Sequence, residues 1–320
     1  MTSLSTDAVT YTAALGRREP TSRKRHRVRI SRRMEPYMMI APVVILFLVL
    51  IGVPIVILIR YSLLDNVIFV QQSHYVGFAN YTTILRSASF WSAVEHTMVF
   101  TVVSVVAQLA LGFAFATLLN TKDLGKVTKA VFRVIYILPW MFTAVIVALL
   151  WRLLLDPNGV INYLLGLVGV ARTAFPWLAT PGWAMACIIV INIWAGYPFF
   201  MITLLAGLQS ISPELYESAR VDGADYAQQL RNVTLPQLRP IIVGIGLLDV
   251  LWTTQQFTLV WITTGGGPLG STQVLGTYIY TLAFQSYLMS PAAASAILLL
   301  LGSLVVAIFY VRHQRRLELA

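Results

Sequence analysis

The sequence predicts an all-α polytopic membrane protein with six transmembrane helices. Of its 320 residues, 58% are hydrophobic and only 11% are charged, whereas a soluble domain carries about a quarter charged residues. The mean hydropathy is +0.74. A chain this poor in charge cannot cover a water-exposed surface, so most of its surroundings must be lipid.

Six stretches are long and apolar enough to cross the roughly 30 Å of hydrocarbon in a bilayer, which takes about 20 residues of helix. Membrane helices tolerate the prolines that some of these stretches contain. The six expected spans cover residues 38–63, 93–119, 131–155, 183–208, 241–263 and 291–311.

The positions of the basic residues predict that both chain ends are cytoplasmic. With six spans, nineteen Lys and Arg residues fall on the side that holds the termini, and four fall on the opposite side. Such a bias is typical of cytoplasmic segments. Residues 1–36 hold nine of the nineteen, and we expect a disordered tail near anionic lipid rather than a signal peptide. The net charge of +10 therefore indicates topology and not nucleic-acid binding.

No catalytic or metal-binding pattern is found along the sequence. There is no HExxH and no Walker A motif, and the four histidines are scattered. The glycines at 265–267 indicate a tight turn after a membrane helix, and the single cysteine, Cys187, lies in an apolar run. We therefore expect a chain that is not an enzyme and binds no cofactor.

Residues 209–240, between the fourth and fifth spans, form an unusually long polar loop. Ser212 followed by Pro213 is typical of a helix start, and Gly223 can adopt the left-handed conformation that ends a helix. A second helical stretch is expected over 226–235, ending at Pro236. The loop could simply be a polar connection, but long ordered loops usually carry function.

This loop resembles the EAA loop of the membrane subunits of ATP-binding-cassette importers that depend on a solute-binding protein. The family pattern is E-A-A, three variable residues, G, and later an apolar-Leu-Pro ending. The chain has Glu217-Ser218-Ala219, then Gly223, and ends with Leu235-Pro236. Ser218 departs from the usual alanine, but serine is small enough to pack in the same place.

Motifs outside the loop resemble the carbohydrate-uptake branch of that family, the permeases of maltose, lactose and glycerol-3-phosphate type. The resemblance covers about residues 37–315; one departure is the segment 289–292, where the family often has Gly-Tyr-Ala. The similar motifs are Pro139-Trp140, Gly159-Val160-Ile161-Asn162, the Thr264–Pro268 tract and Ser271–Leu275.

The resemblance implies a type I ABC importer transmembrane domain over residues 37–315, in a bacterial inner membrane. It implies partners: a second homologous permease subunit, two ATPase subunits that use ATP, an extracytoplasmic solute-binding protein and membrane lipid. The loop would dock on an ATPase subunit. The implied coupling residues are Glu217, Ser218, Ala219, Asp222, Gly223 and Pro236.

Polar residues inside the spans suggest a translocation path, because such residues are costly in lipid and usually face a cavity or a partner. Asp249 lies in the fifth span, and Thr253 and Gln256 follow on the same helical face. Asn192 and Trp252 are further candidates, whereas Gln108 fits packing better. Other aromatics that could stack on a sugar are Trp140, Trp194, Tyr197 and Phe257. Asp249 could instead bond to a neighbouring helix or to the partner permease.

Two alternative functions are consistent with some of these sequence features. The same class of importer could carry a polyamine, phosphate or another solute that is not a sugar. A self-sufficient secondary transporter or channel would need coupling carboxylates or an inverted repeat, and the sequence offers one mid-membrane acid and no evident repeat.

Overall fold

The computed structural model describes residues 35–65, 73–121, 124–169 and 174–318. Almost all of the expected tail 1–36 lies outside these residues. The described chain is helical, with a single isolated β-bridge between Leu64 and Tyr75. Among the described residues, five helices are long and apolar enough to cross a membrane, and a bent pair of helices brings the number to six if the pair is counted as one span. The prediction of an all-α membrane fold is therefore confirmed.

The described part of the chain divides into two units, with the boundary between Val53 and Pro54. In the first, α1 (Glu35–Phe47) leads into one π-helical turn, η1 (Leu48–Gly52). No residue of η1 is buried in the isolated chain, and Leu48, Val49, Leu50 and Ile51 are exposed. Because these residues are apolar, this surface requires lipid or protein around it.

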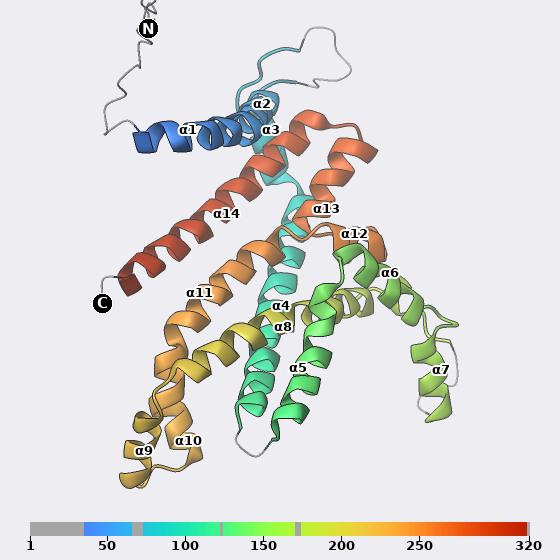
Figure 1. Ribbon diagram of the computed structural model, residues 1–320. Coiled ribbons are helices and arrows are strands. Elements are labelled where there is room, and N and C mark those ends of the chain that lie inside the picture. The colour runs from blue at the N-terminus through green and yellow to red at the C-terminus, as the bar shows by residue number, and fades with distance from the viewer. Residues whose placement is uncertain (1–34, 66–72, 122–123, 170–173, 319–320) are drawn as a thin grey trace, which may run out of the picture. The chain divides into compact units, whose positions relative to one another are not determined.

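The second unit is built on a central contact between two long helices. Helix α8 crosses α4 and packs closely against it (Figure 1). Helix α11 packs against α4, and α14 lies beside α11. The long helices are α4 (Ala88–Asn120), α8 (Trp183–Ser210), α11 (Leu235–Thr254) and α14 (Met289–Glu318).

Glycine makes the close approach of α4 and α8 possible. A Cβ atom added at Gly112 of α4 would lie 2.4 Å from the Cβ of Phe200 and 2.8 Å from the backbone nitrogen of Met201, both on α8. Membrane helices commonly use small residues in this way, since dispersion contacts improve as the backbones approach.

The third span is bent instead of continuous. Helices α5 (Lys126–Met141) and α6 (Ala144–Leu154) meet at 97°. Pro139 lies near the end of α5, and the side chain of Thr143 caps α6 by accepting a hydrogen bond from the Ile146 amide. A proline followed by a capping residue ends one helix and starts the next, so 131–155 is two helices.

The fifth span begins earlier and ends earlier than residues 241–263. A continuous helical stretch runs over Tyr226–Thr254, made of α10 (Tyr226–Gln229), the π-helical turn η3 (Leu230–Thr234) and α11. The expectation that Pro236 ends a helix is wrong. Pro236 stands in the first turn of α11, directly after η3, and we attribute its tolerance to this wider turn, because π turns relieve the ring's clash with the preceding carbonyl.

Shorter elements connect the spans. Three of them, α12, α13 and η4, follow the break at Gln255. These elements are α3 (Ala79–Arg86), α7 (Val160–Leu167), η2 (Trp177–Ala179), α12 (Thr258–Thr264), α13 (Leu275–Tyr280) and η4 (Thr281–Gln285). Helix α2 (Val53–Ser62) belongs instead to the first candidate span, Tyr37–Ser62. Helix α12 ends at Gly265, which has a φ of +62°, as expected for a tight turn after a membrane helix.

The buried side-chain amide of Asn162 stabilises the connection between α6 and α8. Asn162 of α7 donates to the carbonyl oxygens of Pro157 and Phe175 at 3.0 and 2.9 Å, and its own oxygen accepts from Trp177 Nε1 at 2.9 Å. These bonds hold together two parts of the loop between α6 and α8.

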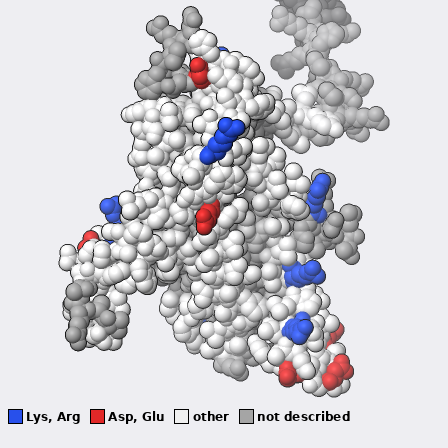
Figure 2. Space-filling view, turned by 180° about the vertical axis from the view of Figure 1, so that it is seen from behind, with Lys and Arg blue, Asp and Glu red and all other residues white. Residues whose placement is uncertain are grey.

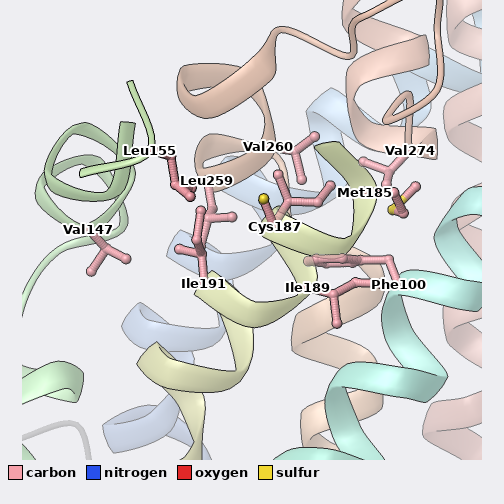
Figure 3. Packing of buried hydrophobic residues seen from close by; sticks show 11 residues of the cluster. Phe100, Val147, Leu155, Met185, Cys187, Ile189, Ile191, Leu259, Val260 and Val274 are labelled. Atoms are coloured by element: carbon pink, nitrogen blue, oxygen red, sulfur yellow. The ribbon is translucent and has the colours of Figure 1, made fainter. Parts of the chain in front are cut away.

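The largest core cluster joins α8 to its neighbours. Figure 3 shows Phe100 of α4, Val147 of α6 and Leu259 of α12 converging on Ile189 and Ile191 of α8. Through these contacts α8 fixes the position of α6 and α12. Both of these helices border the cavity described below.

Candidate functional site

Helix α9 (Pro213–Val221) is terminated at both ends as the sequence predicts. The Ser212 side chain accepts from the Glu214 amide at 3.4 Å. At the other end Gly223 has a φ of +78°, its amide donates to Arg220 O, and the amide of Ala224 donates to Ala219 O. This pair of bonds is a Schellman motif.

The next helical stretch starts with a complete capping box. The side chain of Asp225 accepts from the Gln228 amide at 2.7 Å, and the Gln228 side chain accepts from the Asp225 amide at 2.9 Å. Only two residues, Gly223 and Ala224, separate the C-cap of α9, Asp222, from the N-cap of α10, Asp225. The turn between α9 and α10 therefore has one well-defined conformation.

Two further contacts fasten this loop to the fifth span. Tyr216 Oη of α9 lies 3.0 Å from Thr234 Oγ1 of η3, and Gln229 Nε2 donates to Ala224 O at 2.8 Å. Because η3 continues into α11, α9 is connected to the helix that carries Asp249. A displacement of α9 can therefore reach the membrane interior without crossing a flexible linker.

The outer surface of the loop is exposed. No residue of α9 is buried, and Val221 and Tyr226 are 89% and 73% exposed. The hydroxyl of Ser218 donates to Glu214 O within the helix. Glu217 has no ion-pair partner among the described residues. Figure 2 shows acidic and basic side chains gathered at the end of the molecule that holds α9 and α10, while the middle of that face carries only isolated charged side chains.

The six candidate coupling residues occupy neighbouring parts of this loop and of α11. Five lie in α9 or in the turn that ends it. The sixth, Pro236, lies in α11 and lines a shallow hollow with Arg231 and Arg239.

A cavity of about 220 Å³ opens between α4, α5, α6, α8 and α11. The structure brings all five candidate path residues together in its lining. These residues are Asp249, Thr253, Gln256, Asn192 and Trp252. Gln108 of α4, which the sequence favoured for packing, lines the same cavity. A single glutamine in an apolar helix forms no periodic pattern, so the sequence could not predict that the Gln108 side chain faces the cavity.

Three buried polar atoms in this lining have no hydrogen-bond partner among the described residues. They are Asp249 Oδ2, Gln108 Oε1 and Asn192 Nδ2. The three side chains are at most 6% exposed. Gln108 Nε2 donates to Asn192 O at 2.9 Å, which fixes the orientation of the Gln108 amide. Unpartnered buried polar atoms are rare, since each costs about 1–3 kcal/mol, so the cavity is suited to a polar ligand.

Aromatic rings form a series along the cavity. The ring centroids of Trp140 and Phe199 are 6.3 Å apart, and those of Phe199 and Trp252 are 5.3 Å apart. Trp140 and Trp252 are about half exposed. The other aromatic candidates, Trp194, Tyr197 and Phe257, lie outside this lining. In the described part of the chain, no three His, Cys, Asp or Glu side chains gather as metal ligands would.

A bundle of membrane-spanning helices with a polar cavity and a projecting, rigid helical loop defines a membrane transport subunit. Residues 108–319 match the family described as "Binding-protein-dependent transport system inner membrane component". The chain belongs to this family and is an inner-membrane protein.

Two of the similar proteins are named as sugar permeases. The chain is 35% identical over 252 residues to the trehalose/maltose transport system permease protein MalF of Thermococcus litoralis, covering 78% of this chain and 82% of that protein. It is 30% identical to the diacetylchitobiose uptake system permease protein DasB of Streptomyces coelicolor, covering 87% and 86%.

Among solved structures, the chain resembles a bacterial ABC transporter involved in the import of the acidic polysaccharide alginate. The TM-score is 0.75 and the identity is 29%, covering 88% of this chain and 95% of that chain. A related structure shows the alginate transporter in complex with a periplasmic protein that holds an alginate pentasaccharide. The predicted importer fold is therefore confirmed.

Proposed function

We propose that this chain is a non-catalytic permease subunit of an ATP-driven sugar importer and forms half of the translocation path. The cavity is the observation that carries the proposal. Its unpartnered atoms on Asp249, Gln108 and Asn192 offer the hydrogen-bonding groups that sugar hydroxyls need. The rings of Trp140, Phe199 and Trp252 offer apolar faces for a sugar ring. The sugar cargo of the named relatives agrees with this chemistry.

The cavity is smaller than the roughly 300–1,000 Å³ of sites that enclose a whole small molecule. A second, homologous permease subunit would complete it. We further propose an extracytoplasmic solute-binding protein that delivers the sugar, and both termini and α9 on the cytoplasmic side, as the basic residues predict. The domain boundaries stay as predicted from the sequence, with a permease domain over 37–315.

In this proposal α9 docks on one of two ATPase subunits. Glu217 supplies an ion pair, Ser218 and Ala219 allow close approach, and Asp222 and Gly223 hold the turn. Pro236 marks the start of α11. The exposed apolar side chains of Val221 and Tyr226 support docking, because a specific interface combines apolar contact with a few placed charges. ATP is then used by the partner and not by this chain.

Substitutions of Gly223 test this docking geometry. A Cβ added at Gly223 meets no atom within 4 Å, so a substitution there creates no clash within the chain. A left-handed conformation costs a branched residue roughly 1–2 kcal/mol, which would reduce the correctly turned population about tenfold. We therefore expect Gly223→Val to lower the initial uptake rate of the complete importer about tenfold.

Gly223→Asn is the matched control, because asparagine tolerates the left-handed conformation. Its uptake rate should stay within about threefold of that of the parent protein. Equal uptake by the valine and parent proteins would show that the turn does not matter for coupling.

A further inference from the structure

The side chains that line the cavity include charge of one sign only. It contains one acidic side chain, Asp249, and no basic side chain. We propose that the cavity accepts neutral or positively charged sugars and rejects sugar acids and sugar phosphates, with Asp249 as the group that discriminates. This proposal rests on the sugar-importer function above and narrows its substrate class.

Hydrogen-bond complementarity gives the first reason. The unpartnered Asp249 Oδ2 and Gln108 Oε1 are acceptors, and the unpartnered Asn192 Nδ2 is a donor. A ligand that satisfies all three must offer at least two donors and one acceptor. Sugar hydroxyls do both, and an ammonium group adds donors, whereas an ionised carboxylate or phosphate oxygen only accepts.

Electrostatics gives the second reason. Asp249 is 6% exposed, so little water is available to hydrate an anion brought beside its carboxyl group. The part of the lining that this chain supplies provides no cation to offset that negative charge. Arg152 of α6 donates to Ile262 O of α12 at 3.4 Å and lines a separate hollow with Asp156. Like charges brought together in such a place weaken binding by roughly thirtyfold or more.

The aromatic series gives the third reason. Trp252 and Trp140 are half exposed and are joined through Phe199. An aromatic face favours the C–H face of a sugar ring and attracts a cation. The negative face of the same rings repels an anion.

The experiment compares three trisaccharides on the full chain, assembled with its second permease subunit in lipid nanodiscs, with binding measured by saturation-transfer NMR. The probes are maltotriose, the corresponding trisaccharide of glucuronic acid, and the methyl ester of that acid. The acid and the ester differ in charge and hardly in shape. For the unmodified protein we expect the ester to bind within about threefold of maltotriose, and the acid at least thirtyfold more weakly.

Asp249→Asn should raise the affinity for the acid to within about threefold of that for the ester and lower maltotriose affinity less than tenfold. Maltotriose binding also reports that the variant is folded. Glu95→Gln removes the same charge from an exposed position on α4 outside the cavity lining and should leave all three affinities unchanged.

The outcomes separate the two proposals. Equal binding of acid and ester by the unmodified protein would overturn the charge preference and leave the sugar function standing. Unchanged weak binding of the acid by Asp249→Asn would overturn the role of Asp249. If none of the three sugars binds the assembled pair of permease subunits, both the charge preference and the sugar function are wrong.

Discussion

Replacing Glu217 with lysine should abolish uptake by the complete importer, to about 3% of the parent rate or less. Glu217 is exposed on α9, in a helix with no buried residue, so the change leaves the fold of this chain intact. In the proposed interface its carboxylate faces a basic residue of the ATPase subunit. Reversing one charge of a desolvated pair costs about 2–5 kcal/mol, which corresponds to a factor of at least thirty.

The measurement is the initial uptake rate together with the amount of ATPase subunit that stays on washed membranes. Glu214→Lys is the control, since it makes the same charge change one turn earlier on α9. At the helix start it costs roughly 0.3–1 kcal/mol through the helix dipole, so uptake should fall less than about fivefold. Equal losses in the two variants would mean that Glu217 has no special contact.

Replacing Gly112 with leucine should prevent α4 and α8 from packing. The added Cβ would lie 2.8 Å from the Met201 backbone nitrogen, and backbone cannot rotate away as a flexible side chain can. Forcing extra carbons into a packed core costs about 1–3 kcal/mol and sometimes more. We expect the melting temperature of the purified protein to fall by roughly 5–10 °C, with poor yield from membranes.

Gly302→Leu is the matched control for this packing effect. Gly302 also lies within a membrane helix, α14, but a Cβ there meets nothing within 4 Å. Its melting temperature should stay within about 2 °C of that of the parent protein. Similar losses in the two variants would show that leucine disturbs the helices in general and that the close contact at Gly112 is unimportant.

Features that depend on a few neighbouring residues could be predicted from the sequence. The start of α9 follows from Ser212 and Pro213, and its end follows from Gly223, because capping is decided within one turn. The six apolar stretches follow from bilayer thickness in the same way. Thr253 lies in the cavity with Asp249 because one face of α11 carries both. Gln256 also lines the cavity, but the expectation that it shares this helical face is wrong, because α11 ends at Thr254.

The break inside the third span could not be predicted from hydropathy. The chain stays apolar through the bend between Met141 and Ala144, so an average over a window of residues continues across it. The break after Thr254 does coincide with polar residues, Gln255 and Gln256, but the expected span ran through them to residue 263. The π turn at η3 leaves no mark on hydropathy. Whether Gln108 faces lipid, protein or a cavity depends on where α8 and α11 pack against α4, which is a tertiary property.

The most direct test of the proposed function is uptake into vesicles under two sources of energy. The vesicles hold this chain with its second permease subunit and two ATPase subunits, with the solute-binding protein outside and labelled maltotriose as the sugar. Uptake should require ATP inside, should be lost when the ATPase subunits are omitted, and should not respond to an ion gradient. Uptake by this chain alone, driven by an ion gradient, would contradict the account.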